Sequence, residues 1–334
     1  MQKSVCGEDV SVLFYTENQY RHSFSDYTMH FVNIKKQYLA FGMLVFVVLF
    51  FFNSRPAIQC QFTPEITTYL PTIYGITPTY ARLAQKADLT RLSQTLMLVK
   101  NFHWIVIEDS ETKTKLVENL LKESTLKYTH LNVKTHKSKH STVMDVNICV
   151  FKTETAITSW YCASGVEQRN IALNWLRDHL KAADDKRGVV YFMDDDNTYS
   201  LKVFDEMRKI NKVGVWPVGI VGGMRVEMPL VTNGKVSGFN AVWKPFRPFP
   251  IDMAGFAINA TLFLQHPEAK FSRKVQSGFQ ESEILKYVAT KDDLEPLAEN
   301  CTKVYVWHTR TQKPSILNPK KLKHPPLPDD HIEV

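Results

Sequence analysis

GVVYFMDDD, residues Gly188–Asp196, decides the fold, because an apolar run here ends in three consecutive aspartates. A short apolar run bounded by polar residues is typical of a strand that is buried on both faces of a parallel sheet. Ligands of such sheets bind beyond the carboxyl ends of the strands. The stretch therefore predicts a central buried strand with a polar site at its end.

Strand and helix patterns alternate on the N-terminal side of this stretch. TIYGI (Thr72–Ile76), which stops at Thr77-Pro78, and HWIVIED (His103–Asp109) have the β-rich composition of strands. The expected elements are strands over 72–76, 103–109, 127–133 and 188–196, and helices over 82–98, 113–123 and 165–180. This alternation predicts an α/β fold, with a mostly parallel, Rossmann-like sheet and helices on both faces. Asp109 also follows a strand, so we expect it to share one site with the three aspartates.

The second half of the chain is less regular. The expected strands cover 213–221, 225–227, 254–258 and 303–307, and the expected helix covers 281–288. Residues 134–163 are polar, and no element is predicted there. The tail from Gln312 onward is rich in Lys and Pro.

The uncharged stretch 37–54 contains the apolar run Tyr38–Phe52. Its length is at the lower end of the roughly 17–25 residues that cross a bilayer. A core helix this apolar would need burial on every side, and a cleaved signal peptide would begin nearer the N-terminus. Lys35 and Lys36 precede the stretch and Arg55 follows it, so the positive-inside rule places the N-terminus in the cytosol. The expected layout is a cytoplasmic tail (1–36), a transmembrane signal anchor (37–54), a stem (55–70) and a lumenal remainder.

Cysteine and sequon positions agree with a lumenal domain. Cys6 is then cytosolic, while the other four cysteines face an oxidising lumen, namely Cys60, Cys149, Cys162 and Cys301. Their pairing stays open, and Cys60 is placed to crosslink two chains. Asn259 and Asn300 begin glycosylation sequons.

The formal charge of +7 suits an anionic membrane or substrate, or only an unevenly charged surface. No run of Lys and Arg alternates with aromatic residues, so a nucleic-acid groove is not predicted. Zinc-type His/Cys spacing, glycine-rich phosphate loops and a GxSxG elbow are also absent from the sequence.

Asp194, Asp195 and Asp196 carry the first chemical hypothesis. Adjacent carboxylates repel one another, and a divalent cation or basic side chains relieve that repulsion. Oxygen ligands suit Mg²⁺ or Mn²⁺ better than zinc, and such an ion stabilises a departing diphosphate. The alternative is a solvated acidic turn that caps a helix starting near Asn197.

Six segments carry a family resemblance: PTIYGITPTYARLAQKADLTRLSQTL, GVEQRN, GVVYFMDDDNTYS, WPVG-VGG-R, RPFPIDMAGFA and VWHTRT. Together they resemble the animal β-1,3-glucuronosyltransferases, glycosyltransferase family 43, over about residues 71–313. The family makes the proteoglycan linkage tetrasaccharide or a neural carbohydrate epitope. The resemblance implies a Golgi membrane enzyme, a single-pass type II homodimer with a GT-A-type nucleotide-diphosphosugar transferase fold. It also implies a UDP-sugar-binding half (71–196), an acceptor-binding and catalytic half (197–315) and a C-terminal tail (316–334).

The implied reaction is manganese-dependent, inverting transfer of glucuronate from UDP-glucuronate to the 3-hydroxyl of a β-galactose. On the donor side, the resemblance places Tyr80 and Asp109 around uridine, Asp195 at the ribose and metal, and Asp196 as the main Mn²⁺ ligand. Asp194 would pair with Arg169, Arg310 would face phosphate and His308 the glucuronate. From the residues alone, Tyr80 also fits a core aromatic, and the basic residues fit surface ion pairs.

Glu281 matches the family's catalytic base, which removes the proton of the acceptor hydroxyl. Without the resemblance it fits a glutamate at a helix start, which the helix dipole favours. The acceptor-side matches are Glu227, Trp243, Arg247 and Asp252. A tryptophan at 243 resembles the linkage-region enzymes and favours galactosyl-galactosyl-xylose as acceptor.

Two positions depart from the family pattern. Ala163-Ser164 stands where members often have an arginine, and Ser277 stands where members commonly have a basic residue. Three alternatives stay open: an acceptor of the N-acetyllactosamine type, a different sugar nucleotide, and a glycan-binding relative with little or no turnover.

Overall fold

The computed structural model describes residues 70–135, 141–145, 148–152, 157–161, 165–183, 186–318 and 332. The chain divides into two units, Met1–Thr68 and Tyr69–Val334, and the described residues belong to the second. The predicted anchor at 37–54 lies outside them. Within the described ranges, no helix is both long and apolar enough to cross a membrane.

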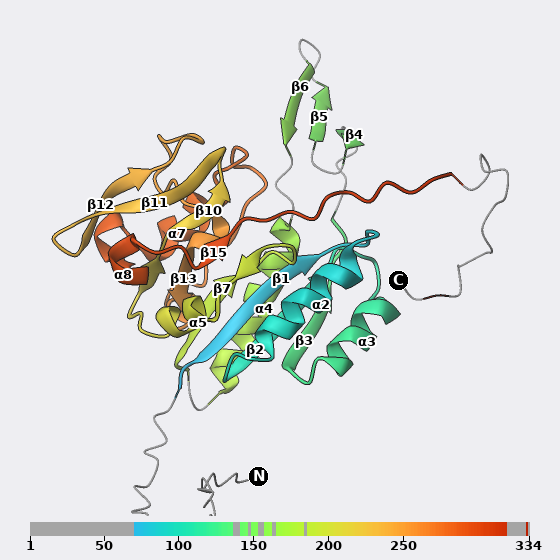
Figure 1. Cartoon of the computed structure of the whole chain (residues 1–334), viewed down its shortest axis with the longest axis horizontal. Coiled ribbons are helices and arrows are strands. Elements are labelled where there is room, and N and C mark those ends of the chain that lie inside the picture. The colour runs from blue at the N-terminus through green and yellow to red at the C-terminus, as the bar shows by residue number, and fades with distance from the viewer. Residues whose placement is uncertain are drawn as a thin grey trace, which may run out of the picture. The chain divides into compact units, whose positions relative to one another are not determined.

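A seven-stranded sheet forms the centre of the second unit (Figure 1). Strands β1, β2, β3 and β7 run parallel in the order β7-β1-β2-β3, and β13 runs antiparallel between β7 and β9. This arrangement confirms the α/β class and the mostly parallel sheet. The strands, in sheet order, are β14 (Leu294–Pro296), β9 (Val213–Val215), β13 (Phe256–Asn259), β7 (Gly188–Phe192), β1 (Thr72–Thr79), β2 (Phe102–Glu108) and β3 (Lys127–Asn132).

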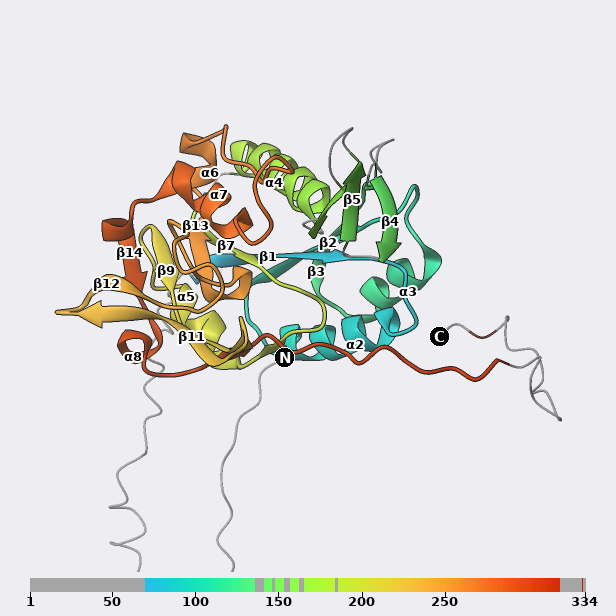
Figure 2. The ribbon, with the colours of Figure 1, turned by 90° about the horizontal axis from the view of Figure 1, so that it is seen from above.

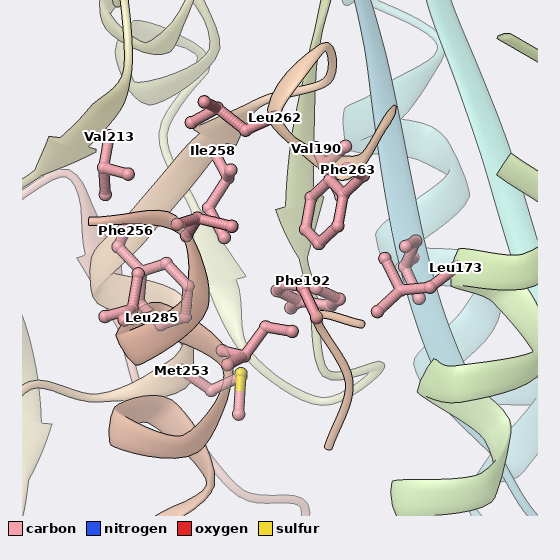
Figure 3. Close-up of a cluster of buried hydrophobic side chains, with 14 of the residues drawn as sticks. Leu173, Val190, Phe192, Val213, Met253, Phe256, Ile258, Leu262, Phe263 and Leu285 are labelled. Atoms are coloured by element: carbon pink, nitrogen blue, oxygen red, sulfur yellow. The ribbon is translucent and has the colours of Figure 1, made fainter. Parts of the chain in front are cut away.

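Helices cover both faces of this sheet, as predicted. Helices α2 (Gln85–Leu96) and α3 (Lys115–Glu123) lie on one face, and α4 (Val166–Ala182) lies on the other (Figure 2). Side chains of successive strand residues point to opposite faces. In β7, Tyr191 therefore packs in the α2 core and Phe192 in the α4 core. Figure 3 shows Phe192 in the second core, among Leu173, Val190, Phe256 and Phe263.

Two smaller sheets and several short helices complete the described fold. The five-stranded sheet has the order β12-β11-β10-β15-β8, and the three-stranded sheet has the order β4-β5-β6. Their strands are β4 (Ser141–Asp145), β5 (Ile148–Lys152), β6 (Ile157–Tyr161), β8 (Thr198–Tyr199), β10 (Val218–Val221), β11 (Met224–Thr232), β12 (Lys235–Asn240) and β15 (Val306–Trp307). The further helices are α5 (Leu201–Met207), α6 (Leu262–Gln265), α7 (Gln280–Val288), α8 (Ala298–Cys301) and the 3₁₀ turns η1 (Met253–Gly255) and η2 (Lys291–Asp293).

The structure corrects several predicted strands. The strand expected over 188–196 ends at Phe192, and the one expected over 303–307 is limited to Val306–Trp307. β1 continues through Pro78 to Thr79, because its pairing with β7 ends at Ile76 and Pro78 has a neighbouring strand on one side only. The strand expected over 213–221 is wrong as one element. It divides around Trp216-Pro217 into β9 of the large sheet and β10 of the five-stranded sheet.

Candidate active site

Parallel strands bring the predicted donor residues to one edge of the large sheet. Tyr80 follows β1, Asp109 follows β2, and the aspartates follow β7. The backbone N–H of Asp109 donates to Thr79 O at 2.8 Å, and that of Met193 donates to Ile76 O at 2.9 Å. The shared polar edge that the sequence predicted is therefore present.

The three aspartates point to different partners. Asp194 Oδ1 accepts from Arg169 Nη2 at 2.8 Å, which is the pairing that the resemblance implied. Asp195 is buried and accepts from Thr79 Oγ1 at 2.7 Å and from Arg82 Nη1 at 2.9 Å. The three aspartates do not cap the following helix, α5, because the side chain of Ser200 caps it.

Asp196 differs from its neighbours, because its carboxylate has no hydrogen bond or ion pair among the described residues. Burial raises its pKa, and repulsion from Asp195 and Asp194 raises it further. In the part of the chain that the structure describes, no three His, Cys, Asp or Glu side chains converge on one point. The carboxylate of Asp196, with the negative charges of Asp194 and Asp195 beside it, fits one ligand of a hard divalent cation. A diphosphate and water would supply the other ligands.

The base-binding candidates flank the same edge. Tyr80 is 43% exposed, so it is not a core aromatic, and the Arg82 guanidinium lies 4.8 Å from the centre of its ring. Asp109 Oδ1 accepts the backbone N–H of Thr135 at 2.8 Å. A planar face and an oriented carboxylate suit a nucleobase.

His308 and Arg310 follow β15, in the five-stranded sheet. The backbone N–H of His308 donates to Gly219 O at 2.9 Å, and its Nδ1 lies 3.1 Å from Asp252 Oδ2. The bond to Asp252 raises the pKa of His308, although burial opposes the shift. Arg310 is exposed and forms no ion pair with any described residue.

A largely buried cluster contains Glu227, Arg247 and Glu281, which the resemblance implied as acceptor-binding residues and catalytic base. Arg247 Nη2 lies 3.2 Å from Glu227 Oε1, and Arg247 Nη1 lies 3.7 Å from Glu281 Oε2. Burial is the main cause that raises the pKa of each carboxyl to about 7, and Arg247 opposes both shifts. Asp252 raises both pKa values further, so the cluster and the His308–Asp252 pair belong to one electrostatic unit.

Glu281 lies in the first turn of α7, and its side chain is 14% exposed. Its Oε2 is buried and accepts no hydrogen bond from the described residues. Glu227, by contrast, is held by Arg247 at hydrogen-bond distance. The free oxygen makes Glu281 the better proton acceptor of the two.

Trp243 lies beside this cluster and is 48% exposed. Gly278 lies beneath it, because a Cβ there would approach Trp243 Nε1 to 2.6 Å. Gly278 also has φ +82°, which favours glycine. Lys244 Nζ donates to Ser277 O at 2.6 Å, so a cation lies at the segment where the sequence lacks the family's basic residue. Ser164 lies outside the described residues.

Arg82 and Thr79, which hold Asp195, were not predicted as site residues from the sequence. Arg82 is part of the quoted TYARL segment, but its contact with Asp195 spans 113 residues. The two sequons also differ in accessibility. Asn300 is exposed, whereas Asn259 donates from Nδ2 to Asn211 O at 2.9 Å and accepts from Thr261. Cys301, within the second sequon, is buried and unpaired.

The model of the family described as glycosyltransferase family 43 matches residues 92–312. Galactosylgalactosylxylosylprotein 3-beta-glucuronosyltransferase I of Drosophila melanogaster is 48% identical over 84% of this chain and 92% of its own length. A Caenorhabditis elegans relative, galactosylgalactosylxylosylprotein 3-beta-glucuronosyltransferase sqv-8, is 52% identical over 76% of this chain and 68% of its own. The Homo sapiens galactosylgalactosylxylosylprotein 3-beta-glucuronosyltransferase 3 is 48% identical over 76% and 75% of the two chains.

Proposed function

Because this chain belongs to glycosyltransferase family 43, we propose that it is a 3-β-glucuronosyltransferase of glycosaminoglycan linkage-region synthesis. It transfers glucuronate from UDP-glucuronate to the 3-hydroxyl of the terminal galactose of galactosyl-galactosyl-xylosyl-protein. The donor carries an α linkage and the product a β linkage, so the reaction inverts the anomeric carbon in one displacement.

The observation that carries the mechanism is the free Oε2 of Glu281. Its carboxyl has a pKa of about 7, so roughly half of it is ionised at neutral pH, and the ionised form is basic enough to take a proton. Arg247 lies 3.7 Å away, which keeps the carboxylate oriented without occupying it as a donor would. We assign to Glu281 the removal of the proton from the acceptor hydroxyl as that oxygen attacks the anomeric carbon.

The donor is held at the edge of the large sheet. Tyr80 and Asp109 bind the uracil, and Asp195 binds the ribose. Arg310 has no ion-pair partner among the described residues, so its guanidinium is available to phosphate. His308, held by Asp252, faces the glucuronate, and its raised pKa favours the cationic form beside a carboxylate.

Asp196 is the residue that would hold Mn²⁺, since its carboxylate is partly buried, is repelled by two neighbours and has no ion-pair partner among the described residues. The ion, when bound, neutralises charge that develops on the departing UDP. Arg169 binds Asp194 at 2.8 Å, so the Asp194 carboxylate is directed away from the position of the ion.

The acceptor galactose lies between Trp243 and the carboxylate cluster. The exposed indole covers the apolar face of the ring. Glu227, Arg247 and Asp252 supply hydrogen bonds to hydroxyls. The hydrogen bond from Lys244 Nζ to Ser277 O supports an enzyme with turnover over a glycan-binding relative, because it places a cation at the segment where the sequence lacks the family's basic residue.

The test is a transfer assay with the purified full-length chain. UDP-glucuronate, UDP-glucose and UDP-galactose compete as donors, with galactosyl-galactosyl-xyloside and N-acetyllactosamine as parallel acceptors. We expect glucuronate transfer to the galactosyl-galactosyl-xyloside, loss of turnover with EDTA and recovery with Mn²⁺. Binding of acceptor without transfer of any sugar would contradict the proposal. Faster transfer of another sugar would show that a different UDP-sugar is the donor.

We further propose a Golgi membrane protein with its catalytic part in the lumen, assembled as a homodimer. The charge difference around 37–54 supports the orientation. Protease protection in sealed Golgi vesicles tests it, because lumenal residues are then resistant until detergent is added. Gel electrophoresis with and without reductant tests a covalent dimer through Cys60.

A further inference from the structure

Asp88 is a buried carboxylate for which the proposed reaction has no role. It lies in the first turn of α2 and is 1% exposed. Its Oδ1 accepts from Thr311 Oγ1 at 2.5 Å and from Arg91 Nη2 at 2.6 Å, and its Oδ2 accepts from Arg82 Nη2 at 2.8 Å. A buried ion needs such partners, because burial without them is costly.

The first arm of this network leads to the donor site. The Arg82 guanidinium that binds Asp88 also binds Asp195, with Nη2 at 2.7 Å from Oδ1 and Nη1 at 2.9 Å from Oδ2. A guanidinium is planar and donates in fixed directions, so two carboxylates on it constrain one another. Asp88 thus fixes the side chain that orients Asp195.

The second arm leads to the C-terminal segment. Thr311 directly follows Arg310, and its contact with Asp88 joins residues 223 positions apart. Figures 1 and 2 show this segment leaving β15 and running past α2. Its described residues, 308–318 and 332, form no helix or strand, so single contacts position this part of the segment. His308 is tied to Gly219 and Asp252, and Thr309 Oγ1 donates to Asp196 O at 2.6 Å.

Resting on the proposed function, we propose that Asp88, Arg82 and Thr311 form a latch that positions two donor-binding residues together, namely Asp195 at the ribose and Arg310 at the phosphate. Asp88 is then a positioning residue for the nucleotide and does not touch the reacting atoms. The latch joins the N-terminal helix α2 to the segment after β15. Its loss weakens binding of UDP and UDP-glucuronate and leaves acceptor binding and the proton transfer at Glu281 unchanged.

The matched pair Thr311→Val and Thr311→Ser tests the latch. Valine keeps the shape of threonine without its hydroxyl, whereas serine keeps the hydroxyl that donates to Asp88. Loss of a hydrogen bond to a charged group predicts on the order of a tenfold rise in the KM for UDP-glucuronate and in the Kd for UDP with Mn²⁺. We expect the kcat and the acceptor KM to stay within about twofold, and Thr311→Ser to match wild type.

Two further variants separate positioning from general stability. Thr90→Val removes a threonine hydroxyl on α2 whose one hydrogen bond among the described residues goes to Lys86 O, and it leaves the donor KM unchanged. Asp88→Asn raises the donor KM in the same direction as Thr311→Val, because it removes the charge that holds Arg82. Melting temperatures without ligand accompany each kinetic measurement.

The outcomes are distinct. Equal donor KM values for Thr311→Val and Thr311→Ser in an active enzyme would overturn the latch and leave the proposed function intact. A lower melting temperature for Thr311→Val with an unchanged donor KM would also overturn it, since the contact would then serve stability alone. A wild-type chain that neither binds UDP nor transfers glucuronate would overturn the proposed function, and the latch with it.

Discussion

Replacing Glu281 by glutamine should stabilise the fold while it removes turnover. The side chain is 14% exposed, and its pKa is raised from 4.5 to about 7, chiefly by burial. At 1.36 kcal/mol per pKa unit, keeping Glu281 ionised in the folded protein costs about 3 kcal/mol. Glutamine has nearly the same shape and no charge, so Glu281→Gln should recover much of this free energy.

The size of this stabilisation depends on pH. A carboxyl with a raised folded pKa contributes stability below its unfolded pKa of 4.5, and that contribution is lost as the pH rises through about 7. The free energy of unfolding of the variant should therefore exceed that of wild type most at pH 8 and least at pH 5. For a chain of this size, the gain at pH 8 corresponds to a rise in melting temperature of about 5–10 °C.

Differential scanning calorimetry of wild type and variant at pH 5 and pH 8 measures the effect. Glu283→Gln is the matched control, because Glu283 lies on the same helix and binds Lys286 at 2.6 Å. That control should keep turnover and gain no stability. Equal melting temperatures for wild type and Glu281→Gln at pH 8 would refute the claim that burial holds Glu281 at a raised pKa.

Three further predictions follow from burial. Burial lowers the pKa of His103 from 6.5 to about 4, and Lys127 adds to the shift, so its contribution to stability is present above pH 6.5 and is lost as the pH falls towards 4. Urea unfolding of wild type should show about 2 kcal/mol of this loss between pH 7.5 and pH 5, which His103→Gln should lack. Phe192→Ala should lower the free energy of unfolding by about 3–5 kcal/mol, because Phe192 is fully buried against Phe271. In cells with a secretory pathway, Asn300→Gln should remove one glycan by gel shift, whereas Asn259→Gln should leave the shift unchanged, since Asn259 is already hydrogen-bonded.

The large sheet was predictable because its strands are apolar on both faces. β1, β2 and β7 each carry an uninterrupted buried run, and α4 shows leucines at helical spacing. The hairpin of β11 and β12 was missed although Asn233-Gly234, a strong hairpin turn signal, separates the two strands. The strands β4, β5 and β6 were missed because their segment mixes polar and β-branched residues without a clear period.

Some residues of the candidate site could likewise be predicted from the sequence, and others could not. The aspartates at the end of β7 were predictable, because strand direction alone places them. The coupling of Arg247 to Glu227 and Glu281 was not, since it depends on packing between segments 20 and 34 positions apart. The same holds for Asp88, which appears in sequence as one polar residue among several in an amphipathic helix.

The pH dependence of kcat/KM for the acceptor is the decisive test of Glu281 as the catalytic base. With saturating UDP-glucuronate and Mn²⁺, we expect a rate that falls tenfold per pH unit as the pH drops below about 7, because a protonated Glu281 cannot accept the hydroxyl proton. Glu281→Gln should lose this limb together with nearly all activity. A wild-type rate that stays constant from pH 8 to pH 5.5, or a fully active Glu281→Gln, would contradict the role of Glu281 as the catalytic base.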